Sequence, residues 1–359
     1  MTTALRTDRY ELTMVEAALR SGRGGRDCVF EVFGRRLPGE RRYGVLAGTG
    51  RVLDAITEFR FGLAELDWLA DEHVVDEATL AFLADYRFTG QVEGYREGEI
   101  YMPGSPVLTV RGTFAEAVLL ETVVLSVLNY DTAVATAAAR MVAAADGHPV
   151  AEMGSRRANE SAAVAAARAA YIAGFSATSN LEAGRTWGIP TMGTAAHAFT
   201  LLHDSEEDAF RAQVAALGSG TTLLVDTYDV RAGVETAIRV AGPSLGGVRL
   251  DSGDLPALVR EVRAQLDALG ATGTRITVTS DLDEHMIAAL RGTPVDTFGV
   301  GTAVVTGSGF PAAGFVYKLV ARSDGRVSVA GGGEWMPVAK TSTGKASIGG
   351  AKRAANTLM

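Results

Sequence analysis

From residue 149 onward the sequence repeats one pattern, in which a short apolar run is followed by a polar, glycine-rich corner and a helix-like stretch. Alternating strands and helices predict βαβ units and hence a parallel sheet. Six or seven units in about 155 residues fit a compact α/β fold with an irregular (incomplete) β/α barrel. A doubly wound open sheet is the alternative, because periodicity does not report whether a sheet closes. The apolar runs cover residues 149–153, 174–176, 189–192, 222–225, 248–250, 276–278 and 297–300.

The two ends of the chain follow a different pattern. The first 130 residues mix strand-like alternation with helical periodicity, and 114–145 is helical and almost free of breakers. The last part of the chain has strand-like runs separated by glycine turns. We therefore expect an N-terminal α/β domain with linking helices at 1–130, a barrel-like catalytic domain at 131–306, and a C-terminal segment at 307–359 that returns to the first domain.

Charge and cysteine content exclude several classes of protein. Lys and Arg number 34 and Asp and Glu 42, a net charge of −8, which is too acidic for a protein whose main partner is nucleic acid. The single cysteine, Cys28, excludes an intramolecular disulfide framework and a Cys-based zinc site. The N-terminus lacks an apolar signal core, and the densest apolar stretch, 118–128, is too short to span a bilayer. We expect a cytoplasmic protein that binds no membrane.

The polar corners indicate a ligand site for phosphates. In parallel α/β folds the carboxyl ends of the strands meet at one edge, where ligands bind. The corner containing Gly301 and Thr302 would let backbone N–H groups approach an anion. Arg156, Arg157 and Arg249 would add charge-assisted donors, although each could instead form a surface ion pair.

Two further corners contain acidic residues and a histidine. Asp251 and Asp254, beside Ser252 and Gly253, could hold a Mg²⁺-phosphate or ribose hydroxyls, and helix capping is the simpler account of Asp254. His197 ends a corner of small residues that leaves room for a ligand, although an isolated histidine is more often structural.

Lysine is confined to one segment. All four lysines, Lys318, Lys340, Lys345 and Lys352, lie in the last 42 residues, and the other 30 basic residues are arginine. Codon preference explains the arginine bias. A site that needs a compact ammonium group would explain why lysine persists in this segment.

Taken together, these motifs resemble those of the nicotinate phosphoribosyltransferases, in the same order and over nearly the whole chain. The matching segments are TDRYELTM at 7–14, GSRR at 154–157, GTAAH at 193–197, RLDSGD at 249–254, GVGT at 299–302 and KTSTGK at 340–345. The resemblance implies the type II phosphoribosyltransferase fold, in which an α/β sandwich built from both chain ends accompanies an irregular β/α barrel. It also implies a homodimer with active sites near the interface.

The implied reaction joins nicotinate to 5-phosphoribosyl 1-pyrophosphate (PRPP) and yields nicotinate mononucleotide and pyrophosphate, as a step of NAD salvage. ATP is the implied co-substrate, with its hydrolysis coupled through a phosphohistidine, and Mg²⁺ would accompany PRPP and ATP. No metal ligand is assigned.

Residue roles follow from the motif matches. His197 matches the phosphorylated histidine, Tyr10 and Thr194 match residues near the nicotinate ring, and Arg249 matches the arginine that meets the carboxylate. Further residues lie in matching motifs: Asp251 as a catalytic carboxylate, Arg157, Ser252, Gly253, Gly301 and Thr302 at PRPP phosphates, and Lys340 and Lys345 as phosphate contacts from the partner subunit.

Two alternatives stay open. The same fold serves nicotinamide and quinolinate phosphoribosyltransferases, and the scarcity of lysine before residue 318 argues against the quinolinate enzyme. A catalytically idle, nucleotide-binding homologue is the second alternative, and retention of His197 argues against it, because binding alone needs no phosphate acceptor.

Overall fold

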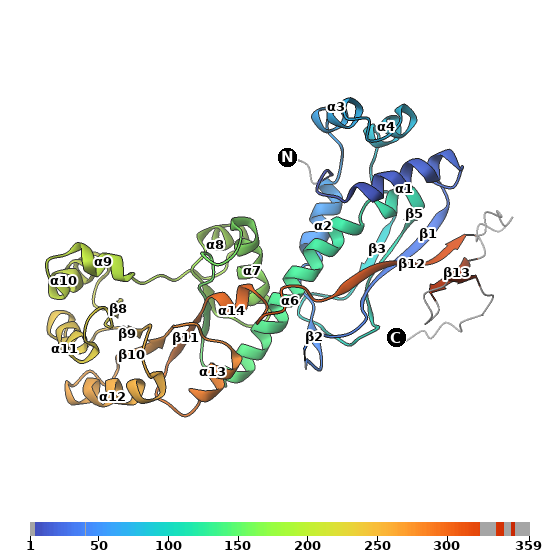
Figure 1. Cartoon of the computed structure of the whole chain (residues 1–359). Helices are drawn as coiled ribbons and strands as arrows, with labels where there is room; N and C mark the ends of the chain where they lie inside the picture. Colours follow the sequence, from blue (N-terminus) through green and yellow to red (C-terminus); the bar gives the residue numbers. More distant parts are fainter. Residues whose placement is uncertain (1–3, 40, 324–334, 341–345, 349–359) are drawn as a thin grey trace. The chain divides into compact units, whose positions relative to one another are not determined.

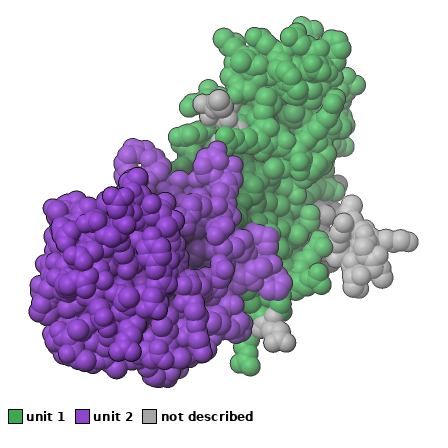
Figure 2. All heavy atoms as spheres, turned by 60° about the vertical axis from the view of Figure 1, so that its left-hand side comes forward, with its two compact units in different colours: residues 1–132, 312–359 green, residues 133–311 purple. Residues whose placement is uncertain are grey.

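The computed structural model describes residues 4–39, 41–323, 335–340 and 346–348. The chain divides into two compact units, one formed by 1–132 with 312–359 and the other by 133–311 (Figure 2). The long helix α6 (Glu121–Ala145) contributes residues to both units.

The first unit is built on a six-stranded antiparallel sheet to which both ends of the chain contribute (Figure 1). Strand β12 pairs with β1, and Tyr317 lies opposite Val32. The predicted sandwich domain built from both chain ends is confirmed by this pairing. The strand order is β14 (Ala346–Ile348), β13 (Trp335–Lys340), β12 (Phe315–Ser323), β1 (Asp27–Gly34), β5 (Pro106–Thr113) and β3 (Gln91–Gly94), and a separate pair joins β2 (Gly44–Val45) to β4 (Ile100–Tyr101).

Aromatic side chains pack the core of this unit. The rings of Phe30 and Tyr317 stack with centroids 4.8 Å apart, and the Tyr317 hydroxyl donates to the carbonyl of Ala117 at 2.8 Å. The buried tyrosine therefore satisfies its polar atom within the core. The helices of the unit are α1 (Arg9–Arg20), α2 (Thr49–Glu58), α3 (Leu63–Asp71), α4 (Glu77–Ala84), α5 (Phe114–Val118) and the first part of α6.

The predicted helical stretch 114–145 is also long and apolar. Within the described residues, 114–145, which contains α5 and α6, is by length and composition able to cross a membrane. The apolar run 118–128, which is too short by itself to span a bilayer, lies within this longer stretch. Of its most apolar window, 61% is buried inside the protein, as in the core helices of soluble proteins.

The second unit contains the predicted parallel sheet. Its strand order is β7 (Ala177–Thr178), β6 (Val150–Glu152), β11 (Thr297–Val300), β10 (Arg275–Val278), β9 (Gly247–Leu250) and β8 (Thr222–Leu224). Every pair is parallel, and within the described residues β7 and β8 are edge strands that do not pair with each other. The predicted incomplete barrel is therefore confirmed.

Helices connect these strands, and Figure 1 shows α10 to α12 along one side of the sheet. Their starts follow local capping: Ser205, Asp229 and Asp283 accept hydrogen bonds from backbone N–H groups of the first turns of α10, α11 and α13. The helices are α7 (Glu160–Ile172), α8 (Leu181–Trp187), α9 (His197–Leu202), α10 (Glu206–Leu217), α11 (Val230–Ala241), α12 (Leu255–Ala268), α13 (Glu284–Ala289) and α14 (Thr302–Val305).

Two of the predicted strands differ from the structure. The run at 174–176 precedes its strand, because Gly174 has φ +108° and turns the chain before β7 begins at Ala177. The run at 189–192 forms only an isolated bridge from Thr191 to Thr178. Pro190 within it has no N–H to donate, which limits the pairing of this segment.

Candidate active site

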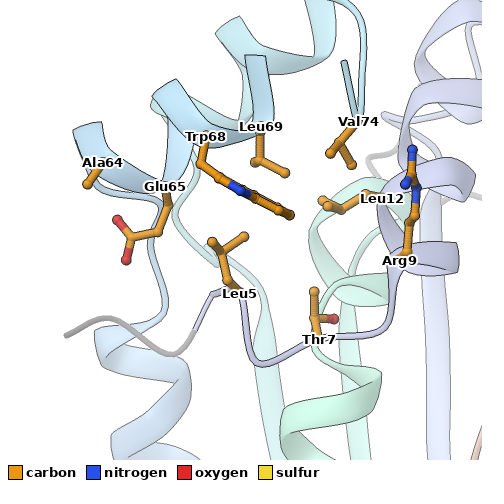
Figure 3. A pocket seen from close by; sticks show the side chains of 9 residues that line it. All are labelled: Leu5, Thr7, Arg9, Leu12, Ala64, Glu65, Trp68, Leu69 and Val74. Carbon is orange, nitrogen blue, oxygen red and sulfur yellow. The ribbon is translucent and has the colours of Figure 1, made fainter. Parts of the chain in front are cut away.

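Two cavities are candidates for the functional site, one in each unit. The cavity of the first unit, about 550 Å³, is mostly apolar around Trp68, and Figure 3 shows its charged residues, Arg9 and Glu65, at opposite ends. The cavity of the second unit, about 430 Å³, has polar and charged groups from several loops in its lining. Converging polar groups are typical of catalytic sites, so the second cavity is the candidate active site.

This pocket lies where the parallel strands end. Its lining comes from the loops after β6, β7, β10 and β11, from the end of β9, and from the segment that leads into α9. Predicted site residues in the lining are Arg157, Thr194, His197, Arg249, Asp251, Gly301 and Thr302.

His197 is the first residue of α9, and its side chain is 42% exposed. Its Nδ1 lies 3.1 Å from the hydroxyl of Thr227. Its Nε2 lies 4.0 Å from Oδ1 of Asp226 and 3.9 Å from Oδ2 of Asp251. The imidazole therefore has a hydroxyl on one nitrogen and two carboxylates on the other, an arrangement that favours a proton on Nε2.

Asp226 follows β8, and its side chain is only 1% exposed. Its Oδ2 accepts hydrogen bonds from the backbone N–H of Asp251 at 2.8 Å and the hydroxyl of Ser252 at 2.7 Å. Its Oδ1, the atom that faces His197, has no hydrogen-bond partner among the described residues. A buried acceptor in this position is available to a proton on the imidazole.

The carboxylates around Asp226 affect a neighbouring glutamate. Burial raises the pKa of Glu206, and the negative charges of Asp229 and Asp226 raise it further. This side of the pocket is therefore electronegative.

Arg249 is held on several sides. Its Nε donates to Oγ1 of Thr279 at 3.0 Å and its Nη1 to Oγ1 of Thr194 at 2.8 Å and, at 3.4 Å, to the carbonyl of Ala195. Its Nη2 pairs with Asp251 at 3.2 Å, and Thr279 also donates to the other oxygen of Asp251. A guanidinium has five N–H donors, and the hydrogen bonds use those of Nε and Nη1, so Nη2, which faces Asp251 as an ion pair, is the nitrogen with donors left for a ligand.

The glycine corners after β6 and β11 meet tightly. A Cβ on Gly154 would lie 2.3 Å from Cγ1 of Val305 and 2.9 Å from the carbonyl oxygen of Gly301, so only glycine fits there. Arg156 and Arg157 follow Gly154, line the pocket, and are exposed. Neither guanidinium forms an ion pair with another described residue, so both can meet an anionic ligand.

The remaining predicted residues do not line this pocket. Ser252 and Gly253 lie in the loop after β9, where Ser252 binds Asp226. Tyr10 is on α1 of the first unit, 46% exposed, and burial and the carboxylates of Glu121, Glu11 and Asp8 raise its pKa to about 12. Its part in the site stays a prediction.

The two lysines are in the C-terminal segment. Lys340 is the last residue of β13, and Lys345 lies outside the described residues. Contact between either lysine and a phosphate stays a prediction.

Sequence reasoning missed several residues of the site. It singled out neither Asp226 as the partner of His197 nor Thr279, which joins Arg249 to Asp251. Both lie directly after apolar runs, so their position in the repeating pattern was the available signal. Ser179 and Met192 also line the pocket and carried no distinctive pattern.

Comparison with known proteins agrees with this architecture. Residues 5–129 match the sequence model of the nicotinate phosphoribosyltransferase N-terminal domain. The chain is 60% identical over 358 residues to a nicotinate phosphoribosyltransferase of Mycobacterium tuberculosis, covering 98% of this chain and 77% of that protein. It is 41% identical over 334 residues to the Bacillus subtilis nicotinate phosphoribosyltransferase, covering 90% and 68%.

Solved structures show the same fold. Human nicotinic acid phosphoribosyltransferase superposes with a TM-score of 0.76 at 29% identity, covering 88% of this chain and 74% of that one. Nicotinate-nucleotide pyrophosphorylase from Pyrococcus furiosus shares the fold with a TM-score of 0.77 at 24% identity, covering 98% and 84%. The extent and level of identity to its bacterial relatives show that the chain belongs to the nicotinate phosphoribosyltransferase family.

Proposed function

We propose that this chain catalyses transfer of the phosphoribosyl group of PRPP to the ring nitrogen of nicotinate, with ATP hydrolysis coupled through phosphorylation of His197. The bond from ribose C1 to pyrophosphate breaks, a bond from C1 to the pyridine nitrogen forms, and pyrophosphate leaves with the electron pair. The observation that carries the proposal is His197 at the pocket wall, with two carboxylates facing Nε2 and a hydroxyl on Nδ1.

Arg249 and Thr194 would hold nicotinate. The Nη2 group of Arg249 can donate to the nicotinate carboxylate, with the guanidinium orientation fixed by Thr194 and Thr279. A neutral amide satisfies a guanidinium less well than a carboxylate does, so nicotinate is favoured over nicotinamide. The reaction needs positioning and electrostatics more than a strong base.

The phosphates of PRPP would lie against the glycine corners. Gly301 and Thr302 open the short helix α14, and the close packing of Gly154 on Gly301 brings the corner that carries Arg156 and Arg157 to the same place. These guanidinium groups supply charge-assisted donors to phosphate oxygens.

His197 would accept the γ-phosphoryl group of ATP on Nδ1. The carboxylates of Asp226 and Asp251 favour a proton on Nε2, so the lone pair is on Nδ1, and this nitrogen would act as the nucleophile once the Thr227 hydroxyl turns aside. The new bond joins Nδ1 to phosphorus, and ADP leaves with the electrons of the broken P–O bond.

Mg²⁺ fits this site as a companion of the substrate. Among the described residues no group of three His, Cys, Asp or Glu side chains could hold a metal ion. Asp251 and Asp281 are the carboxylates in the lining that could complete its coordination. Mg²⁺ usually keeps several waters and binds through one or two carboxylates and substrate phosphates, where it offsets phosphate charge.

The proposal includes a cytoplasmic homodimer in which Tyr10 stacks on the nicotinate ring and Lys340 and Lys345 reach phosphates from the partner subunit. The exposure of the Tyr10 ring is consistent with a role in contacting a ligand or a partner.

Product analysis tests the proposal. Purified protein with PRPP and Mg²⁺ is given nicotinate, nicotinamide or quinolinate, each with and without ATP. We expect nicotinate mononucleotide, formed faster with ATP, and radiolabel from the γ-phosphate of ATP on the protein. His197→Ala should lose the label and the ATP stimulation but keep a residual PRPP-dependent rate. The control is His203→Ala, on the residue that ends the same helix and lies outside the pocket lining, which should keep both.

Other outcomes would reassign the protein. Turnover of nicotinamide or quinolinate in place of nicotinate would make it a sister enzyme. PRPP binding without turnover of any base would make it an idle homologue. Label retained by His197→Ala would place the phosphoryl group on another residue.

A further inference from the structure

Glu152 is a buried carboxylate beneath the pocket wall that the proposed chemistry does not use. It is the last residue of β6 and is 0% exposed. Its carboxylate accepts hydrogen bonds from the backbone N–H of Gly154 and, at 2.5 Å, from Oγ1 of Thr178. Both partners are uncharged, and burial raises the pKa of Glu152. A carboxylate without a cation in the interior is costly, so its presence there needs a physical reason.

The first contact, from the N–H of Gly154, fixes the corner after β6 that contains Arg156 and Arg157. Gly154 precedes Ser155, Arg156 and Arg157, and its carbonyl accepts the N–H of Arg157 at 2.8 Å. A Cβ on Gly154 would lie 2.9 Å from the carbonyl of Gly301, so the two corners touch. The bond from Gly154 to Glu152 therefore sets how closely the arginine corner lies against the Gly301 corner.

The second contact, with Thr178, connects Glu152 to the loop after β7 and, through Asn180, to Ser155. Oγ1 of Thr178, which is fully buried, also accepts the N–H of Asn180 at 3.0 Å. The Asn180 side chain then donates to Oγ of Ser155 at 3.0 Å. Ser179, between Thr178 and Asn180, lines the pocket, and its N–H donates to the carbonyl of Glu152 at 2.8 Å. The network is a closed ring that connects two loops of the wall through one carboxylate.

We propose that Glu152 is a positioning residue that holds the phosphate-binding wall of the pocket, formed by Ser155, Arg156, Arg157 and Ser179, in the geometry that binds pyrophosphate and PRPP. The proposal rests on the proposed function, because phosphates are the groups that this wall would hold. Glu152 does not line the pocket and acts only through Gly154 and Thr178.

A carboxylate fits this position for a chemical reason. Gly154 and Thr178 each donate one hydrogen, so the side chain between them must offer two acceptor oxygens. A glutamine side chain offers one oxygen and one NH₂. The Thr178 hydroxyl would then have to accept from both that NH₂ and the N–H of Asn180, which leaves its own hydrogen without an acceptor. Alanine removes both contacts, so Glu152→Gln should lie between the wild type and Glu152→Ala.

The test measures binding directly as well as turnover. Calorimetry gives the Kd of pyrophosphate with Mg²⁺, and initial rates give KM for PRPP and for nicotinate. Glu152→Ala should weaken pyrophosphate binding and raise the KM for PRPP about 10- to 100-fold, the effect of misplacing binding groups by about 1 Å. The KM for nicotinate should change less than about twofold. Thr178→Val, which removes only the shared hydroxyl, should show the same pattern more weakly and serves if Glu152→Ala does not fold.

Asp296 provides the matched control. Its Oδ2 accepts the N–H of Ile276 at 2.7 Å at the opposite end of the same sheet, before β11 begins. Asp296→Ala removes a comparable contact and should lower thermal stability without changing either KM.

The outcomes separate this inference from the proposed function. Pyrophosphate Kd and PRPP KM unchanged in both Glu152→Ala and Thr178→Val would overturn the inference while nicotinate turnover still stood. A parallel rise of both KM values, or no pyrophosphate binding by the wild type, would also overturn it. Pyrophosphate binding that weakens in the variants of a protein that makes no nicotinate mononucleotide would support the inference and refute the proposed function.

Discussion

Replacing Glu11 with glutamine should change how the stability of the first unit depends on pH. Glu11, on α1, is 0% exposed. Its Oε1 accepts from the N–H of Thr122 at 2.9 Å and the Thr122 hydroxyl at 2.5 Å, and its Oε2 accepts from the Thr7 hydroxyl. It therefore joins α1 to the first turn of α6.

The magnitude follows from the pKa of this carboxyl. Burial raises the pKa of Glu11 from 4.5 to about 7, and the charge of Glu121 adds to the rise, against the lowering effect of the hydrogen bonds from Thr122 and Thr7. Because the folded pKa lies above the unfolded one, this stabilising contribution is complete below pH 4.5 and is lost as the pH rises through 7. The loss amounts to about 3 kcal/mol once the carboxyl is ionised.

Urea unfolding at pH 5, 6, 7 and 8 measures the effect in the wild type and in Glu11→Gln. Glutamine mimics the protonated acid, because its oxygen can accept from Thr122 and its NH₂ can donate to the Thr7 hydroxyl. The variant should exceed the wild type by about 1 kcal/mol at pH 5 and by about 3 kcal/mol at pH 8. Hydrogen exchange of peptides from the start of α6 locates the change.

Taking the difference between the two proteins cancels the titration of all other groups. Glu16→Gln, on the same helix with a carboxylate that is 23% exposed, is the control and should differ from the wild type by less than about 1 kcal/mol at every pH. A difference between Glu11→Gln and the wild type that does not change from pH 5 to 8 would refute the reasoning.

Three further predictions concern the pocket. Arg249→Lys keeps the charge but loses the guanidinium geometry that the side chains of Thr279, Thr194 and Asp251 hold, so steady-state kinetics should show KM for nicotinate raised about 10- to 100-fold and KM for PRPP little changed. Gly154→Ala places a Cβ 2.3 Å from Val305 and should cost about 1–3 kcal/mol in thermal unfolding, whereas Gly273→Ala, with open space at its Cβ, should cost less than about 1 kcal/mol. Asp226→Asn removes the buried charge that faces the imidazole and should slow labelling by γ-labelled ATP about 10- to 100-fold with an unchanged unfolding midpoint.

Much of the fold could be predicted because the strands of the parallel sheet coincide with short apolar runs in the sequence. The strands β6, β8, β9, β10 and β11 fall within or next to apolar runs that the sequence marks by polar corners. The return of the C-terminal strand β12 to the first unit could be predicted because its pattern differs from that of the βα units. The short strand β7 was misplaced because only the backbone turn at Gly174 determines where it begins.

The sequence predicts which residues line the pocket better than it predicts which of their side chains contact one another. Each corner is recognisable in the sequence by its glycine and polar residues. The residues that line the pocket could therefore be proposed without knowing which residues contact them in space. Which carboxylate faces His197 depends on the strand order, and β8 supplies Asp226 only because β8 lies next to β9 in the sheet. Glu152 was missed for the same reason, since in the sequence it is one polar residue within the apolar run 149–153 and its partners lie on other loops.

The charges of the pocket would offset only part of the charge of the proposed substrate PRPP. Its lining contains three arginines and two aspartates, and the pairing of Arg249 with Asp251 leaves Arg156 and Arg157 against Asp281. A phosphate group alone carries about −1.5 to −2 at neutral pH, and PRPP carries a pyrophosphate in addition. Two guanidinium groups offset little more than one phosphate, so further positive charge must come from elsewhere. Mg²⁺ arriving with the substrate would be one source, and Lys340 and Lys345 of a partner subunit, as proposed above, would be another.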